Sequence, residues 1–157
     1  MSEKQELLVL KSKTTEMPYH WSVGREGAKF LQELRDNKKI FGMRCSKCGK
    51  VYVTPRRVCG PCFTPIKEWV ELKAEGTLEA FSIVNYKFID PNTGDIRPVP
   101  YTYGYIKLDG ADSTLSHVVS ITDSSKLRAG MRVKAVFNEE RHGSLKDIKH
   151  FEPINGK

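Results

Sequence analysis

Four cysteines place the strongest constraint on how this chain can fold, because they form two Cys-x-x-Cys pairs separated by ten residues. Two residues between thiolates let one tight turn aim both sulfurs at a single ion, and two such turns held by a hairpin complete a tetrahedral four-sulfur shell. The spacing predicts a structural zinc site, and the same shell also fits iron. Two disulfides or four unrelated thiols are the weaker alternative, because no cysteine is left over. The predicted metal ligands are Cys45, Cys48, Cys59 and Cys62.

A metal site of this kind belongs to a small ribbon, and the chain of 157 residues is long enough to carry a second domain behind it. A ribbon buries little apolar surface, so bound metal would supply its folding free energy. About 80 residues remain downstream, which suffices for a self-sufficient core. The predicted organisation is an N-terminal arm and docking helix (1–37), a zinc ribbon (38–67) and an OB-fold domain (68–157).

The expected location is the cytoplasm. No apolar run of the sequence approaches the roughly 20 residues that span a bilayer. The first residues lack the basic-then-apolar pattern of a secretory signal. Thiolates that bind a metal also point to a reducing compartment.

The net charge of +7 is concentrated around the cysteines. From Lys38 to Arg57 there are seven basic residues and no acidic one, whereas from Gly76 onward eleven basic residues face ten acidic ones. Four thiolates and one zinc ion carry about −2, which offsets part of this excess. The remainder either forms a solvated face or meets an acidic partner: nucleic acid, cofactor phosphates or an acidic protein surface. The candidate residues are Arg44, Lys47, Arg56 and Arg57.

A short helix is predicted before the ribbon. Ser22 can cap its N-terminus, and the apolar residues that follow are spaced for one helical face. Two interpretations of this apolar stripe stay open: it packs on the chain's own second domain, or it docks to another protein. The stripe consists of Trp21, Phe30 and Leu34.

The rest of the chain is predicted to be β-structure. The ribbon has arms at 39–44 and 50–54, and Gly49 and Gly60, each directly after a cysteine, suit the tight turns. Downstream, strand-like alternation begins at 68–73. Five or so strands without a long helix indicate a small Greek-key barrel. The predicted fold class is mainly β: an N-terminal helix, a rubredoxin-like zinc ribbon and an OB-fold-like barrel. The further strands are expected at 77–86, 101–108, 114–121, 131–137 and 144–151.

Nothing in the sequence indicates catalysis by this chain alone. Four cysteine ligands close a zinc site, leaving no open coordination position and no free thiol nucleophile. A redox role would need only one of the two cysteine pairs. His117 falls in a predicted strand, where a packed histidine is the more common case. No glycine-rich phosphate loop is present. The other histidines form no evident triad with a serine and a carboxylate; they are His20, His142 and His150.

Several short signatures occur in a fixed order along the chain. An aromatic-bearing helix precedes a Cys-x-x-Cys-Gly … Pro-Arg-x-x-Cys-x-x-Cys ribbon, and a Glu-Trp-Val segment follows it. One departure is Gly60-Pro61, where proline commonly follows the cysteine directly. The later signatures are Val99-Pro-Tyr101, Leu108-Asp-Gly110 and Leu127-x-x-Gly-Met131-x-Val133 with Phe137.

This ordered set resembles the acyl-CoA-associated zinc-ribbon/OB-fold family of bacteria and archaea. The resemblance implies a companion protein in a heteromeric, thiolase-type acyltransferase complex, in which the partner supplies the catalytic cysteine and histidine. One relative type is the zinc-binding subunit of benzoylsuccinyl-CoA thiolase. The implied function is a non-catalytic subunit that docks to a thiolase-fold partner acting on acyl-CoA and borders the CoA channel. The apolar stripe would anchor the partner, and the basic residues would meet its acidic groups or the CoA phosphates.

Single-stranded nucleic acid is the rival partner, because an OB-fold beside a basic ribbon is a familiar single-strand reader. Aromatic side chains near the predicted strands would be its stacking platforms. Against this interpretation, three of the tyrosines share one strand face, a pattern more often found in a core, and Lys107 is the only basic residue on that strand. The platform candidates are Tyr86, Phe88, Tyr101, Tyr103 and Tyr105.

Overall fold

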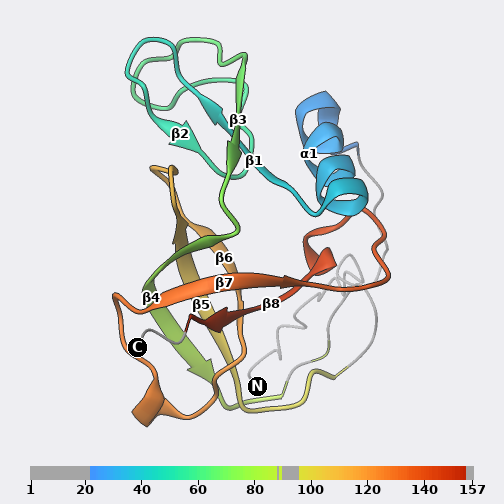
Figure 1. Ribbon diagram of the computed structural model, residues 1–157, viewed down its shortest axis with the longest axis vertical. Helices are drawn as coiled ribbons and strands as arrows, with labels where there is room; N and C mark the ends of the chain where they lie inside the picture. The colour runs from blue at the N-terminus through green and yellow to red at the C-terminus, as the bar shows by residue number, and fades with distance from the viewer. Residues whose placement is uncertain (1–21, 88, 90–95, 155–157) are drawn as a thin grey trace, which may run out of the picture.

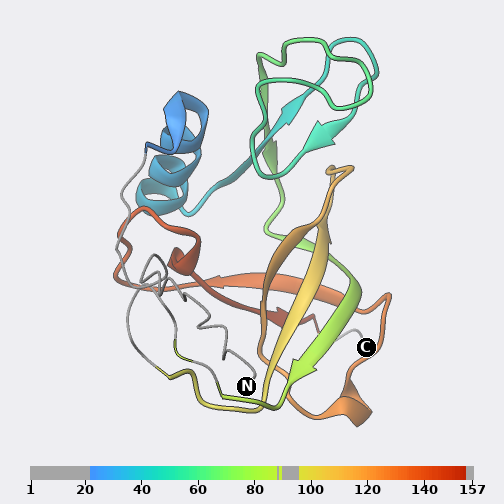
Figure 2. The same cartoon turned by 180° about the vertical axis from the view of Figure 1, so that it is seen from behind.

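The computed structural model describes residues 22–87, 89 and 96–154. It has a three-stranded sheet with long loops at one end, a closed five-stranded barrel at the other, and one helix beside the junction (Figure 1). The view from behind shows the same arrangement, with the helix next to the loop that precedes the last barrel strand (Figure 2). None of the described helices is long and apolar enough to cross a bilayer.

Helix α1 spans Gly24–Asn37, as the apolar periodicity predicted. The Oγ of Ser22 accepts a hydrogen bond of 3.2 Å from the N–H of Gly24, which satisfies one donor of the first turn. The helix ends at Lys38, whose φ of 55° is left-handed and whose N–H donates to the carbonyl of Glu33. This closing bond leads the chain directly into the ribbon.

The predicted docking stripe on α1 is wrong for two of its three residues. Phe30 is 2% exposed and Leu34 is fully buried, and both belong to the main core cluster of the chain. Arg141, in the loop after β7, also joins this loop to the helix, because its Nε donates a hydrogen bond of 2.6 Å to the carbonyl of Arg35. Periodicity shows that a helix has an apolar face but not what covers it, and here the chain itself does. The third residue, Trp21, lies outside the described residues.

The ribbon sheet has the order β2-β1-β3. It comprises β1 (Ile40–Arg44), β2 (Val51–Tyr52) and β3 (Glu68–Leu72). Strand β1 is central, and both of its neighbours run antiparallel to it. Because β1 and β2 are the predicted ribbon arms, the first knuckle is carried at the end of a paired hairpin.

Strand β3 corrects one expectation. The segment at 68–73 was predicted to open the barrel, but its residues pair with β1 along its whole length, from Ile40↔Leu72 to Arg44↔Glu68. The chain reaches the barrel only after Lys73 and Ala74, at β4. Alternation identifies a strand without identifying its neighbour, so the sequence pattern fits either sheet.

The barrel closes in the order β4-β5-β6-β8-β7, which fits the predicted OB-fold-like fold. Its interior is filled by apolar side chains that include Leu78, Ile106 and Phe151, each completely buried. A 3₁₀ turn, η3 (Leu145–Asp147), occupies the first part of the segment predicted as the last strand. The strands are β4 (Glu75–Val84), β5 (Tyr101–Leu108), β6 (Leu115–Val119), β7 (Arg132–Phe137) and β8 (Ile148–Pro153), with a second 3₁₀ turn, η2 (Ser124–Lys126), before β7.

The orientation of β5 corrects a second expectation. Its even-numbered residues face the core and its tyrosines face outward, with Tyr103 42% and Tyr105 53% exposed. A Cβ added at Gly104 would lie 2.5 Å from the Cδ1 of Leu78, so the interior at this level has no room for a larger side chain. The spacing of the tyrosines had indicated a stripe in the core, but their side chains lie on the outer face of the barrel.

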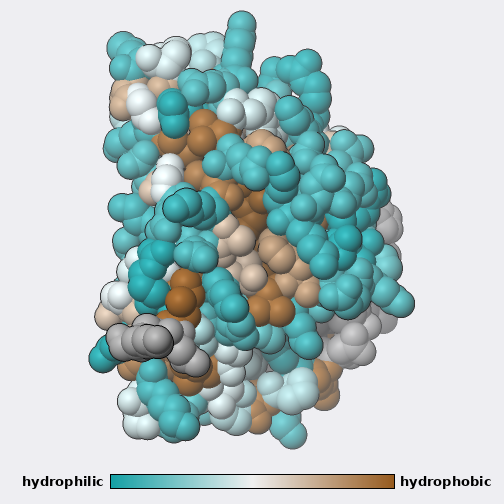
Figure 3. All heavy atoms as spheres, in the orientation of Figure 1, coloured by the Kyte–Doolittle hydropathy of each residue, from teal (hydrophilic) through white to brown (hydrophobic). Residues whose placement is uncertain are grey.

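Ribbon and barrel are joined by backbone and side-chain hydrogen bonds as well as by the chain itself. Asp112, in the β5–β6 hairpin, donates its N–H to the carbonyl of Val51 and accepts the N–H of Val51 on its carboxylate. The hydroxyl of the adjacent Ser113 accepts from the N–H of Val53 and donates to its carbonyl. In the space-filling view, apolar surface gathers in the middle of this face, between the ribbon, α1 and the barrel (Figure 3). Behind this surface, Val51 and Val53 belong to the same buried cluster as Leu108 and Ala111, so the junction combines polar bonds with apolar contact.

A buried carboxylate organises the loop on which α1 rests. Asp147 is 2% exposed and accepts the N–H groups of His142, Gly143 and Ser144 over 2.9, 2.8 and 3.2 Å. Burial alone would raise the pKa of this carboxyl, but the three donors outweigh it and hold the pKa below its usual value. The ionised carboxylate therefore stabilises the loop between β7 and β8.

Candidate metal centre

The two cysteine pairs lie on knuckles that repeat each other in backbone structure. In the first, Cys45 donates its N–H to the carbonyl of Lys50 and accepts the N–H of Gly49. In the second, Cys59 is bonded in the same way to Thr64 and Phe63. Each knuckle is therefore closed by two backbone bonds around its leading cysteine, which fixes the direction of both sulfurs.

A left-handed residue follows the second cysteine of each knuckle. Gly49 has a φ of 74°, and Phe63 occupies the equivalent position with a φ of 53°. Gly60, which was expected to serve the second turn, is not among the residues with positive φ. Placing an L side chain in this region carries strain of about 1 kcal/mol, so the second knuckle is built from a less favourable residue than the first.

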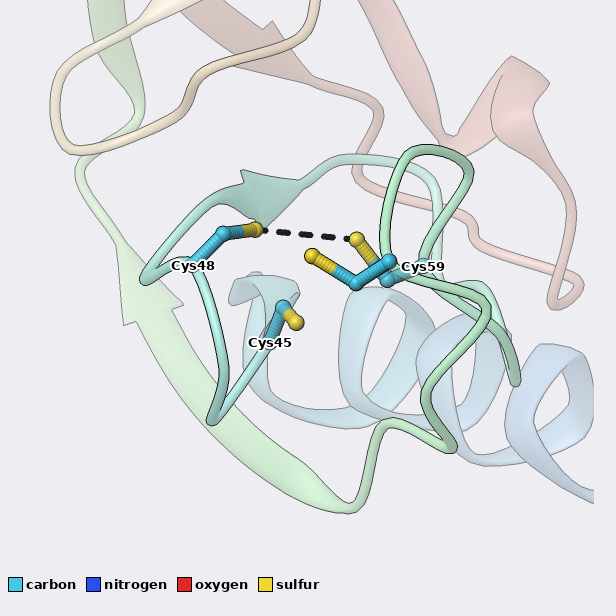
Figure 4. A group of neighbouring side chains, drawn as sticks. Cys45, Cys48 and Cys59 are labelled. Atoms are coloured by element: carbon cyan, nitrogen blue, oxygen red, sulfur yellow. Dashed lines mark hydrogen bonds between the residues drawn. The ribbon is translucent and has the colours of Figure 1, made fainter.

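The four cysteine sulfurs converge on one point. All four Sγ atoms lie within 4.8 Å of one another, and those of Cys48 and Cys59 are 3.6 Å apart (Figure 4). A zinc ion with sulfur ligands at about 2.3 Å holds neighbouring sulfurs roughly 3.8 Å apart. The cluster therefore fits a tetrahedral metal ion with four sulfur ligands. Cys45 and Cys59 are fully buried, Cys62 is half-buried and Cys48 is exposed.

Tyr52 forms an outer contact to this cluster. Its hydroxyl lies 3.3 Å from the Sγ of Cys59, and its ring is covered by the guanidinium of Arg56 at 5.3 Å. The hydrogen bond from Tyr52 lowers the pKa of the Cys59 thiol to about 6. Its bond to Cys59 raises the pKa of Tyr52 to about 12, so the phenol keeps its proton and donates. Tyr52 thereby stabilises a thiolate at Cys59.

Cys62 favours the protonated thiol as long as no cation is bound. The thiol of Cys48 is hydrogen-bonded to that of Cys62, which with burial raises the pKa of Cys62 to about 12. Metal binding requires deprotonated thiols and supplies the compensating charge. Among the described residues, the cluster contains no histidine or carboxylate. Four sulfur ligands leave no position for water or substrate, so the arrangement suits a structural metal rather than a catalytic one.

The basic residues around the cluster divide into two groups. Arg44 forms an ion pair with Glu68 at 3.3 Å, and Arg57 forms one with Glu26 at 3.6 Å. These two are already matched within the chain. By contrast, Lys47 and Arg56 have no ion pair within the described ranges, although Arg56 stacks on Tyr52. They remain available for an acidic partner.

His117 is a packed histidine, as predicted. It is 8% exposed, its Nε2 lies 3.0 Å from the carbonyl of Leu145, and its ring packs edge-on against Phe151. Burial lowers its pKa, so the neutral ring is favoured. His150 lies on β8 and the N–H of His142 is bonded to Asp147. No serine and carboxylate join these three in a triad among the described hydrogen bonds; His20 lies outside the described residues.

Sequence reasoning missed three features of the site and its support: the Tyr52 contact, the Asp112–Val51 bonds and the left-handed Phe63. The Asp112–Val51 bonds join residues 61 positions apart, and the Tyr52–Cys59 contact depends on how the second knuckle folds against β2, so no local pattern reveals either. Phe63 could have been found by aligning the knuckles, because it takes the place of Gly49. Sequence reasoning also could not show that Arg44 and Arg57 form ion pairs within the chain; their contact with an acidic partner stays a prediction.

Two family models together match a continuous stretch of the chain. The model described as the rubredoxin-like zinc ribbon domain of ChsH2 matches residues 33–68, and the one described as the C-terminal OB-fold domain of ChsH2 matches residues 69–138.

Two curated relatives are both described as DUF35 domain-containing scaffold proteins. The one from Methanocaldococcus jannaschii is 25% identical over 107 residues, which is 68% of this chain and 72% of the relative. The one from Methanothermobacter thermautotrophicus is 24% identical over 104 residues, which is 65% of this chain and 74% of the relative.

Solved structures share the fold. A DUF35-family protein of unknown function from Sulfolobus solfataricus matches with a TM-score of 0.60 and 23% identity, over 83% of this chain and 87% of that protein. A chain of the Ltp2-ChsH2(DUF35) aldolase matches with a TM-score of 0.60 and 17% identity, over 85% of this chain and 98% of that one.

Proposed function

Because the chain belongs to the DUF35 family, with its ChsH2-type zinc ribbon and OB-fold, we propose that it is a non-catalytic zinc-binding subunit of a thiolase-fold partner that acts on acyl-CoA. In this proposal Cys45, Cys48, Cys59 and Cys62 bind one zinc ion that keeps the ribbon folded. The partner carries out carbon–carbon cleavage or condensation. The complex is cytoplasmic, where metal-binding thiolates stay reduced.

The single observation that carries the proposal is the closed four-sulfur cluster on a ribbon that is fixed to the barrel. Four sulfurs within 4.8 Å of one another use every cysteine of the chain. No triad was found among the described histidines, and the most buried of them, His117, is bonded to backbone. A chain with a rigid metal-stabilised part and no evident nucleophile suits support of another protein's chemistry better than chemistry of its own.

The comparisons support the scaffold part of this proposal. Both curated relatives are described as scaffold proteins, and one structural neighbour is a chain of an aldolase complex with Ltp2. The thiolase fold of the partner and its acyl-CoA substrate rest on the sequence resemblance. We further propose that the CoA thioester lies near this chain, with Arg56 as the candidate for contact with its phosphates.

Co-expression with thiolase-fold proteins of the same genome tests this function. We expect a tagged copy of the chain to co-purify with one of them in a fixed ratio and to raise its yield or its acyl-CoA turnover. A C45S/C48S variant should lose metal and complex together. A thiolase-fold protein that is soluble and fully active alone, with no complex eluting, would contradict the proposal.

A second candidate function is the binding of single-stranded nucleic acid, favoured by the outward orientation of β5. Tyr103 and Tyr105 stand on the exposed face of the second barrel strand, where OB-folds bind oligonucleotides. Tyr105 lies between Ala80 and Ser116, two small residues, whereas Tyr103 lies between Ser82 and the β-branched Val118. Aromatic rings on such a face can stack on bases.

Salt dependence separates the two candidates. Binding of a fluorescein-labelled oligo(dT) should fall steeply with added salt if the tyrosine face binds nucleic acid. The Y103S/Y105S variant should then lose most of that binding. A protein complex that persists at high salt, together with no oligo(dT) binding at low salt, would favour the scaffold function.

A further inference from the structure

Phe63 is the most exposed large apolar side chain of the ribbon, at 83%, and it is also held in a left-handed conformation. It follows Cys62 directly and closes the second knuckle by donating its N–H to the carbonyl of Cys59 over 2.9 Å. The main chain at this position is therefore needed for the metal site, whereas the aromatic ring is not packed against the protein.

The first knuckle shows what this position requires for folding alone. Gly49 stands at the equivalent place, with a φ of 74°, and a Cβ added there would meet nothing within 4 Å. Glycine adopts this conformation without strain, whereas phenylalanine does not. The ring of Phe63 thus opposes folding in two ways, through its backbone conformation and through apolar surface left in water. Two such unfavourable features in one residue indicate a role outside the isolated chain.

The surroundings of Phe63 combine apolar and basic groups. Val58, which precedes the same knuckle and bridges to Pro65, is 48% exposed. The first knuckle, brought alongside by the converging sulfurs, presents the exposed Lys47 and Lys50. From Lys38 to Lys67 the sequence contains no acidic residue. The end of the ribbon that carries the two knuckles, called the ribbon tip below, therefore presents the exposed apolar side chains of Phe63 and Val58 together with the basic side chains of Lys47 and Lys50.

We propose that Phe63 is an anchor that inserts into an apolar pocket of the protein partner, while carboxylates at the rim of that pocket face Lys47 and Lys50. This inference rests on the proposed scaffold function and assigns the docking surface to the ribbon tip, not to α1. Buried aromatic anchors with a charged surround are the usual source of affinity and orientation at such interfaces. A protein pocket suits the tip better than single-stranded nucleic acid, because Val58 is aliphatic and stacking needs successive rings.

The F63G variant tests the anchor without harming the fold, because glycine is the residue that the first knuckle uses. The free zinc-loaded variant should keep one metal ion per chain and unfold at the same temperature as the wild type or higher. Its affinity for the thiolase-fold protein that co-purifies with the wild type should fall at least tenfold. The K47E/K50E variant should slow association and make it less sensitive to salt.

Tyr105→Ser is the matched control, since it removes another exposed aromatic ring, from the barrel face rather than from the ribbon tip. It should leave the affinity for the protein partner unchanged. If the wild type forms a complex and F63G binds as tightly, the anchor is wrong while the scaffold function stands. If F63G weakens oligo(dT) binding but not the protein complex, the tip serves nucleic acid and the anchor is again wrong. If the wild type forms no complex with any thiolase-fold protein, the scaffold function fails first.

Discussion

Asp112 and Val51 exchange two hydrogen bonds across the junction of ribbon and barrel. The N–H of Asp112 donates to the carbonyl of Val51 over 2.8 Å, and the N–H of Val51 donates to the carboxylate of Asp112 over 2.9 Å. Ser113 repeats this pattern with Val53. The β5–β6 hairpin therefore extends the edge of the ribbon sheet and fixes the metal-bearing end relative to the barrel.

Asp112→Ala should loosen this junction. It leaves the buried N–H of Val51 without its acceptor, which destabilises the fold by about 1–3 kcal/mol. Hydrogen exchange at the amides of Val51 and Val53 should accelerate more than exchange in the barrel strands. Asp112→Asn keeps an acceptor and is the control. Unchanged protection of both amides in D112A would show that the Asp112 carboxylate does not help to hold the junction.

Removal of the metal should unfold the ribbon before the barrel. Cys45, Cys59 and Cys62 belong to a small apolar cluster that also contains Met43, Tyr52 and Ile66 and is separate from the main core. Structural zinc contributes apparent free energies of about 10–16 kcal/mol in small zinc-finger peptides. We expect elemental analysis to find one zinc per chain, and a strong chelator to abolish the NMR dispersion of residues 40–72 while much of the barrel remains. A chelated protein with an unchanged spectrum would contradict a structural metal.

Tyr52→Phe should weaken metal binding without changing the ligands. The hydroxyl lies 3.3 Å from the Sγ of Cys59, and partners that orient a metal ligand typically contribute 10- to 100-fold in affinity. We expect a loss of about tenfold in a competition titration with a chromophoric chelator. Tyr86→Phe, an exposed tyrosine of the barrel, provides the comparison. Equal affinities for Y52F and wild type would mean that the contact plays no part in binding.

Asp147 should make the fold sensitive to acid. Its pKa is lowered in the folded protein, so its contribution to stability is complete above the unfolded value of about 4 and is lost as pH falls through the folded pKa. We expect Asp147→Asn to lower stability at pH 7 by about 1–3 kcal/mol and to flatten the decline in acid. The exposed Glu139→Gln is the control. Parallel stability profiles for D147N and wild type below pH 5 would contradict this role.

Leu34→Ala should behave as a core substitution rather than as an interface substitution. Leu34 is fully buried in the main core cluster, so its truncation is expected to cost about 2–5 kcal/mol. The melting temperature of the free chain should fall accordingly, whereas the exposed Gln32→Ala should leave it unchanged. A stable L34A protein that had lost only partner binding would restore the docking interpretation of the helix.

Local patterns predicted the elements of this fold well and their neighbours less well. The cysteine spacing predicted the cluster, because each knuckle depends on a few consecutive residues. Strand β5 was placed at 101–108, as observed, but the wrong face of the strand was expected to point into the core. Thr102 and Gly104 face the core, although neither is an apolar residue of the kind that a core pattern requires. Strand β3 was recognised but assigned to the wrong sheet. Pairing and orientation are decided by long-range packing, which no short window contains.

The functional interpretation had the same limit. The stripe of α1 has one periodicity whether it faces a partner or the chain's own core, so burial of Phe30 and Leu34 could only be observed. The charges of Arg44 and Arg57 could not be matched to Glu68 and Glu26 before the fold was known.

Barrel closure also affects how this molecule can meet copies of itself. A closed barrel presents no free strand to which another chain could add. In the ribbon sheet, Asp112 and Ser113 occupy the outer side of β2. Strand β3, at the other edge, carries Glu68 and Glu71, and such charges discourage edge-to-edge pairing. We therefore expect little tendency toward aggregation by β-strand addition, and association through side-chain surfaces instead.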